Sequence, residues 1–140
     1  MSSRKEASHS ATVTGGKQLR VLCAEDDDQL AQMLQWALEH SGHVVERAVD
    51  GQAALDRIIA DFDYFDLLVT DHQMPRLSGL GLVEKLREAG FAGKIIVHSS
   101  HLRELDANAY RALAVDHIFT KPVQLAELLV MVERIGGTAP

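Results

Sequence analysis

Four short apolar runs, each ending in charged or hydroxyl side chains, constrain the fold of this chain more than any other feature. Runs of this length and apolarity are typical of buried parallel strands. Because ligands bind beyond the carboxyl ends of the strands in an open α/β sheet, we expect the four polar ends to meet in one pocket. The runs are VLCAEDD (Val21–Asp27), LLVTD (Leu67–Asp71), IIVHS (Ile95–Ser99) and IFTKP (Ile118–Pro122).

The segments between the runs predict an α/β domain with a mainly parallel sheet. Short apolar runs alternate with segments of helical periodicity, which is typical of βαβ units. Right-handed crossovers would place helices on both faces of the sheet. We expect strands at Leu19–Ala24, Val44–Ala48, Asp66–Thr70, Lys94–His98 and His117–Thr120, and helices near residues 28–40, 51–60, 78–89, 102–113 and 124–135.

Composition limits the function classes. The 140 residues carry a formal net charge of -6, whereas nucleic-acid binders need a basic surface for phosphate contacts. No apolar stretch approaches the roughly 18 residues that span a membrane. Residues 1–18 are rich in Ser, Thr and Gly without the apolar centre of a signal peptide, so we expect a disordered leader there. We therefore expect a cytoplasmic protein without nucleic-acid or membrane partners, with one domain at residues 19–136 and a short tail at 137–140.

The polar ends of the runs have the chemistry of a site for Mg²⁺ and a phosphoryl group. Glu25 and Asp26 form an acidic pair, Asp71 follows a buried run, Ser99 brings a hydroxyl and Lys121 an ammonium. Carboxylate oxygens suit the hard Mg²⁺ ion, and a lysine offers a point charge to phosphoryl oxygens.

Each of these residues also has a plainer interpretation. The acids at positions 25–28 could form a solvated turn, in which Asp27 or Asp28 caps the following helix. The Ser99 hydroxyl could bond only to its own loop, and Lys121 could be a surface lysine. The convergence of the four polar ends favours the site over these alternatives.

The order and spacing of these residues resemble the receiver domains of two-component response regulators, which include a single-domain chemotaxis response regulator. The resemblance covers about residues 19–135 and implies a flavodoxin-like, doubly wound fold: a five-stranded parallel sheet of order 2-1-3-4-5 with five flanking helices. It implies a stand-alone phosphoacceptor signalling switch that assists its own phosphorylation and slow dephosphorylation, and not an enzyme. It rests on Glu25-Asp26, on Asp71 within DLLVTDHQMPRLSG, on Ser99 and on Lys121-Pro122.

The resemblance also implies the ligands of the metal. Asp26 and Asp71 would bind Mg²⁺ directly, Glu25 directly or through water, and Gln73 through its backbone carbonyl. Asp71 would then accept a phosphoryl group from the phosphohistidine of a sensor histidine kinase.

Two further residues have roles by resemblance. Lys121 would pair with the acceptor carboxylate and then with the phosphoryl oxygens, and its peptide bond to Pro122 would be cis. The Ser99 hydroxyl would move inward on phosphorylation and draw its loop with it. Ile118 stands where the family often has Tyr or Phe, and strand alternation should point Phe119 to the opposite side. We therefore expect no aromatic side chain at this position of the switch.

The resemblance implies protein partners. They are a sensor histidine kinase or a histidine phosphotransfer protein, and a downstream protein that would bind the face made by the fourth helix, fifth strand and fifth helix, the output surface of the family. The same face is expected to support a homodimer on activation. The resemblance implies that phosphodonors dock largely on the first helix. Trp36 points roughly opposite to the apolar face of that helix, so we hypothesise that it belongs to the kinase-docking surface. Alternatively, it packs against the leader or a neighbouring helix. The predicted apolar face consists of Leu30, Met33, Leu34, Ala37 and Leu38.

The histidines near the site match no zinc-binding pattern. For His98, His101 and His117 we expect structural or solvent-facing roles. His72, Gln73 and His101 should rim the pocket and affect the lifetime of the aspartyl phosphate.

Two other functions stay open. A pseudo-receiver would keep the fold as a protein-interaction module without phosphorylation. A small phosphohydrolase would use Asp71 as nucleophile, but haloacid-dehalogenase-type phosphatases carry a second acid where this chain has Gln73.

Overall fold

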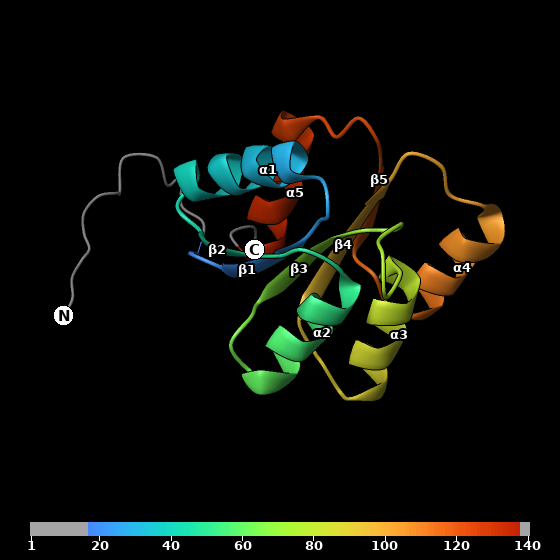
Figure 1. Ribbon diagram of the computed structural model, residues 1–140. Helices are drawn as coiled ribbons and strands as arrows, with labels where there is room; N and C mark the ends of the chain where they lie inside the picture. Colours follow the sequence, from blue (N-terminus) through green and yellow to red (C-terminus); the bar gives the residue numbers. More distant parts are fainter. Residues whose placement is uncertain (1–16, 138–140) are drawn as a thin grey trace.

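The computed structural model describes residues 17–137, which form five strands and five helices in strict alternation (Figure 1). Every expected element occurs, and each end lies within two residues of its prediction. The predicted leader at residues 1–18 lies almost wholly outside the described residues, as do residues 138–140 of the tail. The elements are β1 (Arg20–Ala24), α1 (Asp28–His40), β2 (Val44–Ala48), α2 (Gly51–Ala60), β3 (Leu67–Asp71), α3 (Gly79–Glu88), β4 (Lys94–Ser99), α4 (Glu104–Ala112), β5 (His117–Thr120) and α5 (Leu125–Ile135).

The strands form one parallel sheet in the order β2-β1-β3-β4-β5, which confirms the predicted doubly wound topology. The chain passes from β1 to β2 on one side and returns to β3 on the other. The order therefore reverses between β1 and β3, and such a switch point opens a crevice at the carboxyl ends of the two strands. Glu25 follows β1 and Asp71 ends β3, so both acids lie at this crevice.

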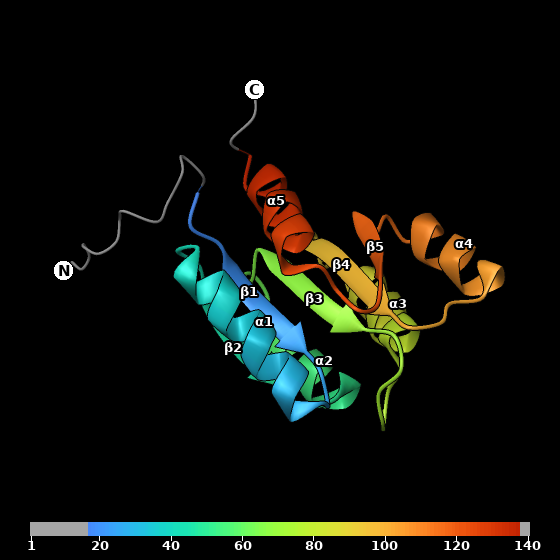
Figure 2. The ribbon, with the colours of Figure 1, turned by 90° about the horizontal axis from the view of Figure 1, so that it is seen from above.

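The sheet separates two hydrophobic cores. Helices α1 and α5 cover one face, and α2, α3 and α4 cover the other (Figures 1 and 2). Successive side chains of a strand point to opposite faces, so each strand supplies both cores in turn. In β3, for example, Leu68 packs on the α2, α3 and α4 side and Val69 on the α1 and α5 side.

Local side-chain caps start the first three helices. Asp27 accepts hydrogen bonds from the first turn of α1, as one of the two alternatives predicted. Asp50 caps α2 and Ser78 caps α3. Each cap satisfies backbone N–H groups that have no partner within the helix.

The predicted apolar face of α1 is wrong at Met33, whose side chain is 52% exposed. The buried residues of this helix are Ala31, Leu34, Ala37 and Leu38. Successive residues are about 100° apart around a helix, so Met33 lies at the edge of the stripe that contains Leu34. Ala31 occupies the opposite edge and lets the helix approach the sheet on that side.

Arg87 ties the end of α3 to the two loops beside it. Its partly buried guanidinium donates hydrogen bonds of 2.7–3.0 Å to four backbone carbonyls, those of Phe91, Gly93, Leu113 and Ala114. This cluster lies at the end of the sheet opposite the crevice. Within residues 17–137, no helix is long and apolar enough to cross a membrane.

Candidate functional site

Three strands place Glu25, Asp71 and His98 side by side at the carboxyl edge of the sheet. Each comes two residues after a residue of the core beneath α1 and α5, namely Cys23, Val69 and Ile96. Residues two apart on a strand point to the same face, so the three side chains lie on the α1 and α5 side of the sheet. All three are buried, with exposed fractions of 1%, 6% and 1%. One ligand atom from each lies within 4.8 Å of the others.

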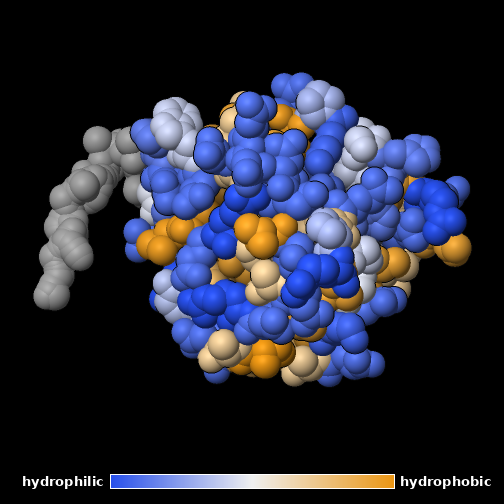
Figure 3. All heavy atoms as spheres, viewed as in Figure 1, coloured by the Kyte–Doolittle hydropathy of each residue, from blue (hydrophilic) through white to orange (hydrophobic). Residues whose placement is uncertain are grey.

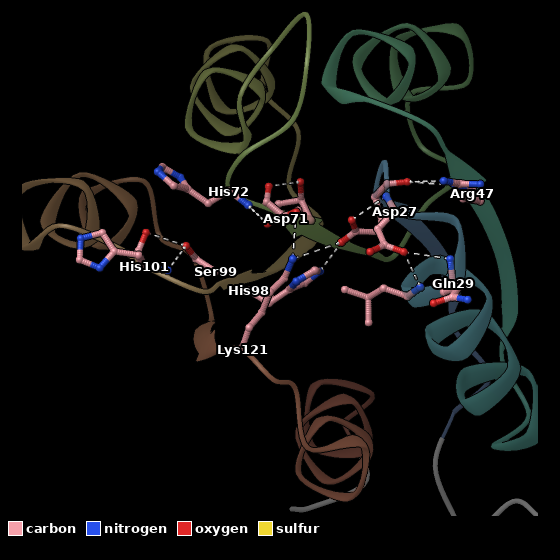
Figure 4. Close-up of polar contacts among 12 residues, drawn as sticks. Asp27, Gln29, Arg47, Asp71, His72, His98, Ser99, His101 and Lys121 are labelled. Carbon is pink, nitrogen blue, oxygen red and sulfur yellow. Dashed lines mark hydrogen bonds and ion pairs between the residues drawn. The ribbon is translucent and has the colours of Figure 1, made fainter.

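The carboxylate of Asp71 is fixed at both oxygens. Its Oδ1 accepts a hydrogen bond of 2.7 Å from the backbone N–H of His72, and its Oδ2 lies 3.1 Å from Lys121 Nζ. The same ammonium is 3.9 Å from Glu25 Oε1. Lys121 directly follows β5, and Figure 4 shows its side chain extending to Asp71. The peptide bond between Lys121 and Pro122 is cis, as expected.

Glu25 is a buried carboxylate with one unpartnered oxygen. Its Oε2 accepts a hydrogen bond from the backbone N–H of Asp27, whereas Oε1 has no hydrogen-bond partner among the described residues. The guanidinium of Arg47 donates two hydrogen bonds to the backbone carbonyl of Glu25 and so fixes the turn after β1. Burial raises the pKa of Glu25 to about 7, and the charge of Asp71 acts in the same direction against the Asp27 N–H and Lys121.

The remaining predicted metal ligands lie on the rim. Asp26 and Gln73 are exposed and line a groove of about 650 Å³ between the loop after β3 and the start of α4. The site thus offers one exposed and two buried carboxylates opposite a single ammonium. An oxygen-rich, net negative donor set with an unpartnered Oε1 fits a hard dication such as Mg²⁺.

His98, for which we expect a structural or solvent-facing role, does not face solvent. It is buried in the pocket, its Nε2 is 3.7 Å from Glu25 Oε1, and neither ring nitrogen has a hydrogen-bond partner among the described residues. Burial lowers the pKa of His98 to about 4; Asp71 opposes this shift and Lys121 adds to it. Strand alternation could have found this residue, because it lies two positions after the core residue Ile96.

Ser99 lies on the other side of the sheet from His98. It ends β4 and is 4% exposed. Its hydroxyl donates to the carbonyl of His101 at 3.0 Å and accepts from the His101 N–H at 3.3 Å (Figure 4). In this state, therefore, the hydroxyl bonds to its own loop.

An unpredicted contact connects the site to α4. Nδ1 of His72 is 2.7 Å from the hydroxyl of Tyr110, and its Nε2 is 3.7 Å from a carboxylate oxygen of Asp106. Tyr110 is fully buried, and burial raises its pKa. The residue that follows Asp71 is thereby joined to the helix that carries Asp106 and Tyr110. Ile118 packs, like Tyr110, in the core on the α2, α3 and α4 side of the sheet.

The neighbour of Ile118 behaves as strand alternation predicts. Phe119 is 8% exposed and packs in the core beneath α1 and α5, on the opposite side of the sheet. No aromatic side chain of β5 therefore reaches the α4 side of the sheet.

Trp36 lies away from the carboxylate pocket, on the outer side of α1. It is 60% exposed, and its ring stacks on that of His40 with 4.0 Å between centroids. With Met33 and Leu125 it lines a shallow, largely apolar groove of about 400 Å³. On the face seen in Figure 3, apolar atoms lie in small groups among hydrophilic ones.

Comparison with known proteins gives consistent results. The family model of the response regulator receiver domain matches residues 21–133. The response regulator protein PmrA of Pseudomonas aeruginosa is 34% identical over 117 residues, covering 84% of this chain and 52% of that protein. The chain spans about half the length of the curated relatives it matches.

Solved structures share the fold. The receiver domain of the Francisella response regulator 1452 is 28% identical, with a TM-score of 0.78 over 88% of this chain and all of that one. The CheX–CheY–BeF₃–Mg²⁺ complex from Borrelia burgdorferi contains a chain that is 19% identical, with a TM-score of 0.78 over 84% of this chain and 88% of that one. At this identity, the second likeness concerns the fold alone.

Proposed function

The chain belongs to the response regulator receiver domain family, and from this we propose that it is a signalling switch phosphorylated on Asp71 in the presence of Mg²⁺. One observation carries the proposal. Asp71 is a buried carboxylate at the switch point of the sheet, held by the His72 N–H and by Lys121 beside the unpartnered oxygen of Glu25. A fixed carboxylate among cation-binding groups is suited to accept a phosphoryl group.

The reaction would be a displacement at phosphorus. An oxygen of Asp71 forms the new P–O bond while the P–N bond of a phosphohistidine breaks and its electron pair leaves with the imidazole. Lys121 stays close enough to pair with the phosphoryl oxygens. Glu25, Asp26, Asp71 and the Gln73 carbonyl would hold Mg²⁺, which when bound supplies positive charge for these oxygens.

The response would start at Ser99. Its hydroxyl would exchange its bonds with His101 for one to a phosphoryl oxygen, and the loop before α4 would follow. The face of α4, β5 and α5 would then bind a downstream protein or a second copy of the chain. We further propose that His72, Gln73 and His101 set the lifetime of the aspartyl phosphate.

Trp36 supports a proposed docking surface for the phosphodonor, a sensor histidine kinase or a histidine phosphotransfer protein. An exposed tryptophan beside an apolar groove is a typical anchor for a protein partner. Trp36→Ala should slow phosphotransfer from the cognate kinase and leave phosphorylation by a small phosphodonor unchanged. An unchanged rate from the kinase would refute the docking role.

The test of the main proposal is intact mass after incubation with phosphoramidate, with and without Mg²⁺. We expect one phosphoryl adduct that requires both Mg²⁺ and Asp71 and is absent from Asp71→Asn. Circular dichroism checks that the variant is folded. A folded wild type that gives no adduct and does not bind Mg²⁺ would instead be a pseudo-receiver.

A further inference from the structure

The pocket contains a nitrogen donor among its oxygens. We propose that Glu25, Asp71 and His98 bind a first-row transition dication of the Zn²⁺ or Co²⁺ type, at a site that excludes Asp26 and takes the place of the Lys121 ammonium. The metal site is independent of the proposed function. Its expected effect, inhibition of Asp71 phosphorylation, rests on that function.

The geometry is close to that of a metal centre. Nε2 of His98 and Oε1 of Glu25 are 3.7 Å apart, and the ligand atoms of all three residues lie within 4.8 Å. Ligands at about 2.0–2.2 Å from a tetrahedral ion are about 3.4 Å from one another. Side-chain rotations that move the ligand atoms by about an ångström would therefore complete the site. The three residues end or directly follow adjacent strands, so their backbones already lie side by side.

The burial of unpartnered ligand atoms favours metal binding. Oε1 of Glu25 and both ring nitrogens of His98 are buried without hydrogen-bond partners, and coordination would satisfy the oxygen and one nitrogen. Two carboxylates also balance a dication without help from Lys121. That side chain is 23% exposed, so its ammonium has a route to solvent when the metal enters.

The donor set determines which metal is favoured. Mg²⁺ prefers oxygen ligands and keeps several waters, whereas an imidazole nitrogen raises the affinity for ions such as Co²⁺ and Zn²⁺. The exposed Asp26 belongs to the expected Mg²⁺ ligands and does not belong to this group. Substitution of His98 or of Asp26 therefore separates the two sites.

The experiment is a Co²⁺ titration of the full, EDTA-treated chain, followed by visible absorption and by competition with Zn²⁺. We expect one equivalent of Co²⁺ to bind, and Zn²⁺ to displace it. His98→Leu should lower the affinity at least roughly tenfold. Asp26→Asn and the matched control His101→Ala should bind as the wild type does. Retained affinity in folded His98→Leu, or loss in His101→Ala, would overturn the proposal.

A second measurement needs no variant. In histidine-ring ¹H–¹⁵N spectra, Zn²⁺ should shift one ring nitrogen of His98 more than any other; an unshifted His98 would overturn the proposal. In the phosphoramidate assay with Mg²⁺, Zn²⁺ should reduce the adduct of the wild type and spare that of His98→Leu. A wild type that binds Co²⁺ through His98 but never forms an adduct would refute the proposed function and leave the metal site intact.

Discussion

Glu25 and His98 form a buried pair, and replacing either one should change how the free energy of unfolding depends on pH. The two replacements should change this slope in opposite directions. Both side chains are 1% exposed. Burial raises the pKa of Glu25 from 4.5 to about 7 and lowers that of His98 from 6.5 to about 4. Between about pH 4.5 and 6.5, the folded pair thus holds one proton on Glu25, and the unfolded pair holds one on His98.

The pair therefore binds the same number of protons in the folded and the unfolded state. In the metal-free wild type it adds no pH dependence to the free energy of unfolding in that range. In His98→Leu only Glu25 remains; its folded state binds the extra proton, so stability is lost as the pH rises. In Glu25→Gln only His98 remains; its unfolded state binds the extra proton, so stability is lost as the pH falls. One proton is worth about 1.4 kcal/mol per pH unit, or about 3 kcal/mol across the range.

Urea unfolding followed by circular dichroism, with EDTA at pH 4.5, 5.5 and 6.5, measures these slopes. The other carboxylates cancel when each variant is compared with the wild type at the same pH. The double variant Glu25→Gln/His98→Leu is the control, and its profile should run parallel to that of the wild type. Single variants that also run parallel to the wild type would show that the two groups are not titrated as their burial requires.

Three further predictions concern stability, each measured by urea unfolding. Arg87→Met removes four hydrogen bonds to backbone carbonyls and should cost about 2–4 kcal/mol. Leu34→Ala should cost about 3–4 kcal/mol, because its side chain is fully buried, and Met33→Ala less than about 1 kcal/mol; similar costs would contradict the observed face of α1. Tyr110→Phe should cost about 1–2 kcal/mol, because His72 Nδ1 loses its partner, and no loss would show that this bond adds nothing.

The topology and most helix starts could be predicted, because periodicity and caps are local features. The strand ends were harder. β3 and β4 each run one residue further than predicted, to Asp71 and Ser99. A polar side chain at such a position resembles a loop residue, yet the backbone still pairs with the neighbouring strand: Asp71 with His98, and Ser99 with Thr120. The predicted β4 already contained His98, so strand alternation from Ile96 was enough to place its side chain on the face beneath α1 and α5.

Other features depend on packing that no local pattern contains. The stripe with Met33 and the stripe with Ala31 both have helical spacing, and only the neighbouring elements decide which one is buried. The contact between His72 and Tyr110 joins residues 38 positions apart. A buried tyrosine hydroxyl needs a partner, but the sequence does not say which one.

The division of the helices between the two faces of the sheet has a consequence for assembly. A protein bound only to α1 and another bound only to α4 would touch opposite faces, as the views in Figures 1 and 2 show. The two contact surfaces do not overlap, so neither protein need displace the other from its own helix. Any effect of one on the affinity of the other would then measure the coupling free energy between the two faces of the sheet.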